Sequence, residues 1–301
     1  MPTTVAVAGA TGRLGHLIVA ALLKRGATVR ALVRPGSPED KRKGLEGAQI
    51  IEVDPTDQAA LTRALTGAEI VVSALNGLRD VIVDGQTTLL NAAVAAKVSR
   101  FIPSDYAADI TKVPSGENRN FDLRREFREQ HLLKAPIKST SILIGGFMEL
   151  LLWGRALDAK AHKVAYWGTP DQPLNYTTTP DVAEITATAA LDPDAPPILR
   201  IAGDTLTTQG LADAAGAALG TPFTLERAGS IEDLAAMIAR EKQAHPEQEA
   251  EIFPRFQQLQ YTHNMQSGSG ALAPLDNGRY DLKLTSVREL LAANANRLKS
   301  T

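Results

Sequence analysis

The sequence contains no cysteine, carries little net charge and has no long apolar run. Without cysteine, the chain can form no disulfide bond, no thiolate metal site and no thiol nucleophile. The net charge of −2 provides no field that would attract nucleic acid or an anionic membrane surface. No segment approaches the roughly 18 consecutive apolar residues of a membrane-spanning helix, and no signal peptide is recognisable. We therefore expect a cytoplasmic monomer or homodimer without metal, nucleic-acid or membrane partners.

What the sequence does contain, through its first half, is a regular alternation of short apolar runs and helical patterns. Strands alternating with helices of this length are typical of βαβ units in a parallel sheet that is covered on both faces. The fold class predicted is therefore α/β, a doubly wound Rossmann sheet. The predicted strands are residues 4–10, 28–34, 48–54, 69–75, 100–106 and 138–146, and the main helices between them are 14–26, 59–67 and 84–98.

The second half of the chain is less regular. We predict helices at residues 149–159, 181–191, 208–219 and 230–243, with short strands and a proline-rich loop around them. This pattern suggests a smaller α+β domain that binds the substrate or acts as a lid. We place the boundary near Trp153, which gives a nucleotide-binding domain of residues 1–153. The substrate domain is then mainly residues 154–301, with some segments returning to the sheet.

The stretch GATGRLG lies where the first predicted strand ends and the first helix begins. In dinucleotide sites, the first glycine of such a turn permits the tight bend, the second lets a pyrophosphate approach and the third lets helix and strand pack closely. Backbone amides at the helix N-terminus then face the phosphates. Because strand, turn and helix occur together, we predict a dinucleotide site. Its residues are Gly9, Thr11, Gly12, Arg13, Leu14 and Gly15.

The end of the second strand indicates which dinucleotide binds. NAD sites place an acidic residue there for the ribose 2′-hydroxyl, but this chain has Arg34. A guanidinium suits the 2′-phosphate of NADP(H) through paired hydrogen bonds. Lys41, Arg42 and Lys43 follow in the loop, where they are either further phosphate ligands or solvated charges. The sequence favours NADP(H) as the cofactor.

Ligands of open α/β sheets bind beyond the carboxyl ends of the strands. Leu75 and Asn76 follow the fourth strand, Ser104 and Tyr106 end the fifth, and Phe147 follows the sixth. We expect these positions to surround the nicotinamide. For the substrate we expect an apolar pocket that suits aromatic compounds, although each of its side chains could equally belong to the core. The substrate candidates are Phe147, Met148 and Tyr176, with Trp153 as a further possibility.

Several motifs together resemble the isoflavone reductase-like and NmrA-like family, a group of atypical relatives of the short-chain dehydrogenases. They are GATGRLG, LVR, VDPTD, SAL, Gln86, RFIPSDY, Phe121 with Arg124, GGF and TTPDVA. The resemblance implies a nucleotide domain with a parallel sheet and a small substrate domain, and it adds Gln86 to the cofactor site. It also implies one of two functions. Some members are NADPH-dependent reductases of phenylpropanoid-like aromatic compounds, and others bind NADP(H) as redox-sensing regulators.

The catalytic group is less certain, because no tyrosine is followed four residues later by lysine, the pair that ordinary short-chain dehydrogenases use. The resembled reductases carry a lysine three residues after a phenylalanine, and here that position is Arg124. Arginine keeps its charge and is a poor general acid, but it can stabilise negative charge on a substrate oxygen. The proton would then come from water or another side chain. The candidates are Tyr106, His131, Tyr176 and His263.

Helical geometry places Arg124 at the edge of an apolar face that carries Leu123 and Phe127. We therefore expect Arg124 to point inward, with a salt-bridged surface arginine as the alternative. Arg119, Arg125 and Arg128 are expected in solvent. The sequence thus favours a reductase of a small aromatic or quinone-like compound, with Arg124 and Tyr106 as catalytic candidates. The alternative is an NADP(H)-binding regulator without turnover.

Overall fold

The computed structural model describes residues 2–154 and 156–300, and these residues form two compact units. Unit 1 comprises the chain up to Tyr106, together with Leu123–Ile142 and Val182–Leu199. Unit 2 comprises Ala107–Asp122, Leu143–Asp181 and the chain from Arg200 onward. Each unit therefore consists of several separate segments of the chain, whereas the prediction placed one main boundary near residue 153.

Unit 1 is built on a six-stranded sheet in the order β3-β2-β1-β4-β5-β6, in which every pairing is parallel. The predicted doubly wound α/β fold is confirmed. The strand order reverses between β1 and β4, the point at which such sheets bind ligands beyond their carboxyl ends. The strands are β1 Thr4–Ala8, β2 Thr28–Val33, β3 Gln49–Glu52, β4 Ile70–Ser73, β5 Arg100–Ile102 and β6 Lys138–Ser139.

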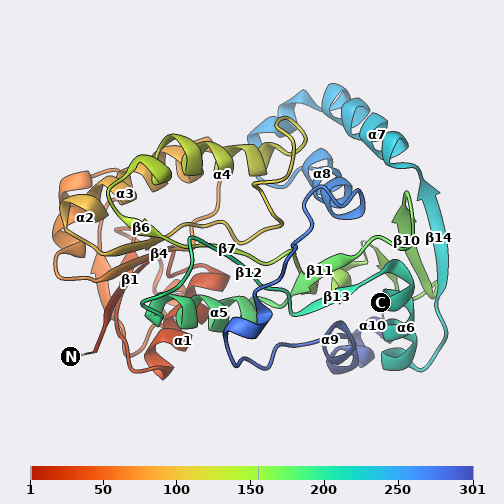
Figure 1. Ribbon diagram of the computed structural model, residues 1–301, viewed down its shortest axis with the longest axis horizontal. Coiled ribbons are helices and arrows are strands. Elements are labelled where there is room, and N and C mark those ends of the chain that lie inside the picture. Colours follow the sequence, from red (N-terminus) through yellow and green to blue (C-terminus); the bar gives the residue numbers. More distant parts are fainter. Residues whose placement is uncertain (1, 155, 301) are drawn as a thin grey trace. The chain divides into compact units, whose positions relative to one another are not determined.

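Helices cover both faces of this sheet (Figure 1). On one face, Leu65, Leu90 and Phe127 of three helices share a buried core with Phe101 of β5. On the other face, Arg25 at the end of α1 contacts Glu184 and Thr188 of α5. The helices of unit 1 are α1 Arg13–Lys24, α2 Gln58–Leu65, α3 Gln86–Ala95, most of α4 Arg119–Gln130 and most of α5 Thr179–Leu191. Short helical turns occur at η1 Glu39–Lys41, η2 Asp80–Gly85 and η3 Leu132–Lys134.

Unit 2 contains two small sheets. Strand β10 pairs with β14 and β9, and β11 pairs with β13 and β8. A core around Met148, Leu211 and Leu291 joins these strands to helices. The strands of these two sheets are β8 Gly146–Phe147, β9 Leu157–Asp158, β10 Lys163–Trp167, β11 Leu174–Thr177, β13 Asp204–Leu206 and β14 Thr224–Gly229. Strands β7 Ser141–Leu143 and β12 Ile198–Arg200 pair with each other, and each has residues assigned to both units. The helices are α6 Thr208–Leu219, α7 Ile231–Ala244, α8 Arg255–Gln266, α9 Val287–Ala293 and α10 Ala295–Ser300, with short turns at η4 Met148–Trp153, η5 Pro246–Ala250 and η6 Asn277–Arg279.

Two predicted elements differ from the structure. The strand predicted over residues 138–146 is divided into β6, β7 and β8. Thr140 separates β6 from β7, and Gly145, in a left-handed conformation with φ of 70°, bends the chain between β7 and β8. The helix predicted over residues 149–159 is only a short 3₁₀ turn, η4. Gly154, with φ of 72°, ends this turn, and Leu157 already belongs to a strand. Both differences involve glycines that reverse the chain locally. No helix in residues 2–154 and 156–300 has the length and apolar character needed to cross a bilayer.

Candidate functional site

The glycine turn between β1 and α1 leaves no room for side chains at two of its three glycines. Gly9 has φ of 77°, and a Cβ atom added there would lie 2.6 Å from the carbonyl oxygen of Ala74, just beyond β4. A Cβ atom on Gly15 would overlap the carbonyl oxygen of Gly9. The backbone of the turn therefore lies directly against the neighbouring strand end, and α1 starts directly against the turn.

The middle glycine is less crowded than the other two. A Cβ atom on Gly12 would approach only the carbonyl oxygen of Gly9, at 3.2 Å. Gly12 is exposed and is the N-cap residue of α1, and it supplies no side chain to cap the first turn. Helix N-termini of this kind bind phosphate through their backbone amides and partial positive charge. The shape fits a pyrophosphate, since any side chain at Gly12 would fill the space that a phosphate would occupy. Thr11 and Leu14 are half-buried beside this space, and Arg13 is exposed.

Arg34 follows the last residue of β2 directly and is exposed, as are Lys41 and Lys43 in the loop that continues from it. Arg42 differs from these three because its side chain is only 26% exposed and forms an ion pair with Glu52 at 2.7 Å. From the sequence, Arg42 was treated like Lys41 and Lys43, but in the structure Arg42 is half-buried and paired, whereas the two lysines are exposed. Arg34 therefore stands at the end of β2 as the cation that the prediction requires.

At the ends of β4 and β5, Ser104 joins three segments that are distant in sequence. Its hydroxyl donates to the carbonyl oxygen of Leu75 at 2.6 Å, and its amide donates to Oε1 of Gln86 at 3.0 Å. Gln86 itself donates to the carbonyl oxygen of Ile82 at 2.9 Å. The Nε of Arg124 donates to the carbonyl oxygen of Ser104 at 3.0 Å. Four of the predicted site residues, Leu75, Gln86, Ser104 and Arg124, thus form one connected group within unit 1.

Asp105 is a residue of this region that sequence reasoning missed. It is fully buried, and burial raises the pKa of its carboxyl group above the ordinary value. The neighbouring Ser141 hydroxyl and the charges of Arg124 and Arg128 oppose this shift. The aspartate in RFIPSDY was visible in the sequence, but nothing in the local pattern indicated that it would be buried near two arginines.

Tyr106 is also buried, and burial raises the pKa of its phenol well above the usual range. Burial therefore makes this phenol a weaker acid than that of an exposed tyrosine. The other proton-donor candidate of this unit, His131, stacks on Phe127 with ring centroids 6.3 Å apart, which places its ring beside the core. Tyr106, unlike His131, directly follows Asp105 in the chain and lies two residues after Ser104.

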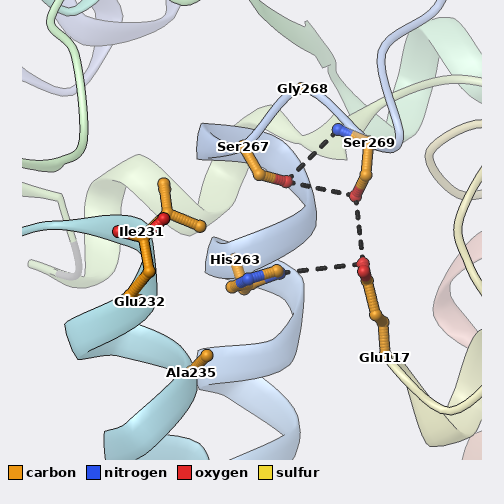
Figure 2. Close-up of a pocket in the computed structure, with 8 residues that line it drawn as sticks. All are labelled: Glu117, Ile231, Glu232, Ala235, His263, Ser267, Gly268 and Ser269. Atoms are coloured by element: carbon orange, nitrogen blue, oxygen red, sulfur yellow. Dashed lines mark hydrogen bonds and ion pairs between the residues drawn. The ribbon is translucent and has the colours of Figure 1, made fainter.

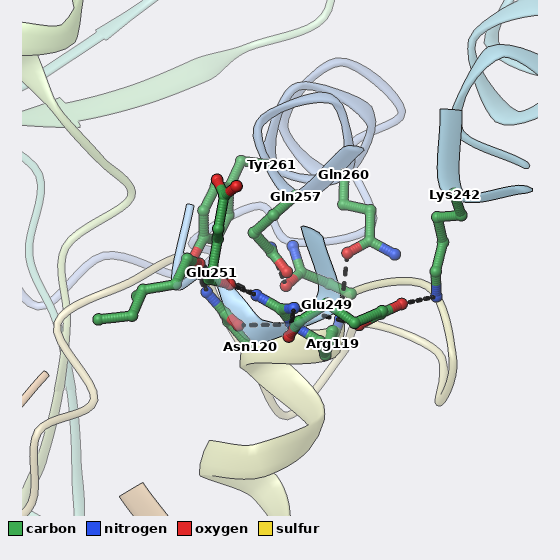
Figure 3. A network of polar contacts seen from close by, with 10 residues as sticks. Arg119, Asn120, Lys242, Glu249, Glu251, Gln257, Gln260 and Tyr261 are labelled. Atoms are coloured by element: carbon green, nitrogen blue, oxygen red, sulfur yellow. Dashed lines mark hydrogen bonds and ion pairs between the residues drawn. The ribbon is translucent and has the colours of Figure 1, made fainter. Parts of the chain in front are cut away.

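The arginines of α4 do not all lie as expected. Arg119, Arg125 and Arg128 were predicted in solvent, and that prediction is wrong, because none of the three is exposed. Arg119 is only 16% exposed and donates to Glu249 and to the carbonyl oxygen of Glu251 (Figure 3), while its guanidinium stacks over Phe256. Arg128 is half-buried and donates to the hydroxyl of Ser141 at 3.3 Å. A helix pattern read alone could not show these partners, which come from distant segments.

In unit 2 the predicted substrate residues differ in exposure. Phe147 in β8 is half-buried, whereas Met148 and Tyr176 are buried and belong to the core of that unit. Burial raises the pKa of the Tyr176 phenol well above its usual range. Trp153 is 53% exposed. Among Phe147, Met148 and Tyr176, Phe147 is therefore the residue that retains substantial accessible surface.

Unit 2 also contains a pocket of about 460 Å³ between α7, α8 and the loop that carries Glu117 (Figure 2). His263 on α8 faces Glu117 across it, with Nδ1 and Oε2 3.8 Å apart. The segment of residues 267–269 closes one end of the pocket. It is held by bonds from Ser269 to Ser267 and from Gly270 to Asn264. Within residues 2–154 and 156–300, no group of three or more histidine or acidic side chains could hold a metal ion.

Comparison with known proteins identifies the family. The NmrA-like family model matches residues 1–280. The chain belongs to the NmrA-like family. An isoflavone reductase homologue of Zea mays is 29% identical over 202 residues, which are 63% of this chain and 64% of the relative. The chain thus matches somewhat less than two thirds of that relative's length.

Solved structures of other proteins agree with the fold of this chain. The leucoanthocyanidin reductase–NADPH complex from Vitis vinifera superposes with a TM-score of 0.81 at 20% identity, covering 97% of this chain and 99% of the other. An NADPH-dependent quinone oxidoreductase from Escherichia coli gives a TM-score of 0.72 at 24% identity, covering 96% and 98%. At these identities the likeness establishes the fold, and the family resemblance noted in the sequence is confirmed by the family model.

Proposed function

We propose that this NmrA-like chain is an NADPH-dependent reductase that transfers hydride to a small aromatic or quinone-like compound. The observation that carries the proposal is the open cradle at Gly12, which lies at the start of α1, in a unit that also presents Arg34 at the end of β2. Relatives that bear the names of isoflavone, leucoanthocyanidin and quinone reductases support the substrate class.

In this proposal the residues of unit 1 divide the cofactor between them. The first turn of α1 holds the pyrophosphate, and Arg34 pairs with the 2′-phosphate. Leu75, Asn76, Gln86 and Ser104 bound the nicotinamide at the ends of β4 and β5. NADPH supplies the hydride when it is bound. The part of this assignment with the most contacts is Ser104, because its hydroxyl and amide fix Leu75 and Gln86 relative to each other.

Arg124 would stabilise the negative charge that develops on the acceptor oxygen as hydride arrives. A guanidinium cannot release a proton near neutral pH, so the proton comes from water or from Tyr106; burial makes the Tyr106 phenol a weaker acid, which favours water as the donor. Within unit 2, the candidate to contact a ring compound is Phe147, with Met148 and Tyr176 forming the buried layer behind it. The side chains thus take separate roles in charge stabilisation, proton supply and binding.

A regulator without turnover is the second candidate, and one observation favours it. The Nε of Arg124, at the position of the reductases' lysine, donates to the carbonyl oxygen of Ser104. The position therefore holds no group that can exchange a proton near neutral pH, while the glycine turn remains suited to NADP(H). Such a protein would bind both redox forms and pass the difference to a partner.

One experiment separates these functions. Purified protein is titrated with NADPH and NADH, and NADPH oxidation is then followed with aromatic carbonyls, allylic phenols and quinones. The reductase proposal expects preference for NADPH and turnover on at least one class. Tight NADPH binding with no turnover on any class would favour the regulator. Equal affinity for the two dinucleotides, or an NADPH affinity unchanged in Arg34→Ala, would overturn the assigned cofactor site.

A further inference from the structure

The loop between β2 and β3 is fixed by a continuous chain of polar contacts. The hydroxyl and amide of Ser37 both donate to the carbonyl oxygen of Arg34, at 2.7 and 3.1 Å. The Nε of Arg42 donates to the carbonyl oxygen of Ser37 at 3.1 Å. The Nη1 of Arg42 then pairs with Oε1 of Glu52 at 2.7 Å. These contacts connect Glu52 to the backbone of Arg34 through two intermediate residues.

Glu52 occupies a position where its charge matters. It is the last residue of β3, and the sheet register places it opposite Val33, the residue before Arg34. An acidic group near the end of β2 is what NAD sites use to accept hydrogen bonds from the ribose 2′-hydroxyl. The same carboxylate would repel a 2′-phosphate. In this chain the carboxylate is neutralised by Arg42, which is drawn away from solvent to meet it.

The contacts of Arg42 distinguish it from the other cations of the loop. Its guanidinium binds the protein itself at two points, one on Ser37 and one on Glu52. Arg34, Lys41 and Lys43 are exposed, and their side chains extend from the same loop. A guanidinium can bind two partners at fixed angles, which a lysine ammonium does less well. Arg42 is therefore suited to hold the loop, and Arg34 to meet the ligand.

We propose that Arg42 is a positioning residue for dinucleotide choice, which favours NADPH by masking Glu52 and by fixing the turn that carries Arg34. It does not contact the phosphate. This inference rests on the proposed function, because it takes Arg34 to be the partner of the 2′-phosphate. The chain would thus contain both an NADPH-selecting arginine and an acidic residue of the kind that selects NADH, with the acidic residue kept neutralised.

The test compares dissociation constants of NADPH and NADH for the whole protein and for Arg42→Ala, Glu52→Gln and the double variant. Arg42→Ala should weaken NADPH binding about tenfold and change NADH binding by less than about twofold. The reason is that an uncompensated carboxylate repels the 2′-phosphate, which only NADPH carries. Glu52→Gln in the Arg42→Ala background should restore most of the lost NADPH affinity. Glu52→Gln alone should lower NADPH affinity by about twofold or less, since Arg42 still donates its hydrogen bond to the carbonyl oxygen of Ser37.

A matched control is available in the same unit. Arg25 pairs with Glu184 at side-chain exposures of 23% and 34%, close to the 26% and 47% of Arg42 and Glu52, but it lies at the far end of α1 from the glycine turn. Arg25→Ala should leave the NADPH to NADH ratio unchanged. Arg42→Lys keeps a charge beside Glu52 but loses the Nε donor to Ser37. Its NADPH affinity should lie between those of the parent and Arg42→Ala. It also serves if Arg42→Ala folds poorly, as judged by NADH affinity and melting temperature.

The outcomes separate this inference from the proposed function. If the parent protein shows no preference for NADPH, the proposed cofactor site fails. If the parent prefers NADPH through Arg34 but Arg42→Ala keeps the preference, only the positioning role is overturned. If Arg42→Ala costs the same NADPH affinity in the parent and in the Glu52→Gln background, Arg42 does not act by masking Glu52, and the proposal as stated is overturned.

Discussion

The Nε of Arg124 donates a hydrogen bond of 3.0 Å to the carbonyl oxygen of Ser104, the residue whose hydroxyl and amide fix Leu75 and Gln86. This bond holds the positive charge of Arg124 beside the ends of β4 and β5, where the nicotinamide is proposed to bind. The bond orients the guanidinium through its Nε and ties it to the backbone at the end of β5.

The first prediction concerns the charge at position 124. Arg124→Ala should reduce turnover by about 100-fold or more, the usual effect of removing one group that stabilises an oxyanion. Arg124→Lys should keep or raise turnover, and it should add a pH dependence, because lysine can exchange a proton. The measurement is steady-state NADPH oxidation across pH with the substrate found in the screen.

Arg125→Ala is the control for this series, since the residue is the next arginine of the same helix. Arg125 is also half-buried, so the variant controls for the loss of a guanidinium from α4, and its turnover should match that of the parent within about threefold if the effect is specific to position 124. Unchanged turnover in Arg124→Ala would remove Arg124 from the proposed chemistry and would favour a different group for the oxyanion.

The second prediction contrasts two glycines of the same turn. Gly15→Ala places a methyl group on the carbonyl oxygen of Gly9, so the backbone must shift, and we expect a loss of about 3 kcal/mol in the free energy of unfolding. Gly12→Ala meets only one atom at 3.2 Å and should lose about 1 kcal/mol or less. It should nevertheless weaken NADPH binding at least tenfold, because the methyl group enters the phosphate space. Denaturant melts and NADPH titrations distinguish the two effects, and equal binding by Gly12→Ala and the parent would contradict the cradle.

The third prediction uses two buried aspartates with opposite pKa shifts. Burial raises the pKa of Asp105 in the native state. Its contribution to stability is therefore full below the ordinary aspartate pKa and is lost as pH rises through the raised native value. For Asp109, burial acts to raise the pKa, but bonds from Thr111 and Arg200 hold it below the ordinary value. Its contribution is present above the ordinary pKa and is lost as pH falls through the native one.

Denaturant unfolding across acidic pH tests these signs. Asp105→Asn should remove a component in which the free energy of unfolding falls with rising pH. Asp109→Asn should remove a component in which it rises, and should cost stability near neutral pH because Arg200 loses its partner at 2.7 Å. Two variants with the same change in slope would show that one of the assigned shifts has the wrong sign.

The fourth prediction concerns Arg119 and the segment that encloses it (Figure 3). The guanidinium donates to the carbonyl oxygens of Glu249, Glu251 and Ile252 and lies 5.1 Å from the ring centroid of Phe256. Arg119→Ala should lower the free energy of unfolding by about 2–3 kcal/mol, since several acceptors lose their donor. Arg119→Lys should rescue little, because an ammonium lacks the planar fork that reaches three carbonyl groups at once. NADPH affinity should stay that of the parent, and a large change in it would mean that Arg119 affects the cofactor site.

The fold was predictable from the sequence because its signals are local. Most strands of the sheet are short apolar runs, and the spacing of Gly9, Gly12 and Gly15 is typical of a strand, a turn and a helix in that order. The predicted six-stranded sheet is therefore confirmed, apart from its last strand. That strand is divided where Gly145 turns the chain, which a run of apolar residues does not reveal.

The surroundings of individual side chains were less predictable, because their partners are distant in the sequence. Arg119 appeared to be a solvated helix residue, but its main partner Glu249 lies 130 positions further along. Arg42 appeared equivalent to Lys41 and Lys43 until the ion pair with Glu52 separated them. The burial of Asp105 likewise depends on how β5 and α4 pack together, which periodicity alone does not specify.

The bond between Arg124 and Ser104 has an evolutionary consequence. Its acceptor is a backbone carbonyl, so it places no demand on the side chain at position 104, and a lysine at position 124 could donate to the same oxygen. Two of the arginine codons differ from the lysine codons by one nucleotide. An ancestor of this protein could therefore exchange one residue for the other in a single mutation and keep the local architecture. The chemical role of position 124 can therefore change without a change in the selection that acts on the surrounding fold.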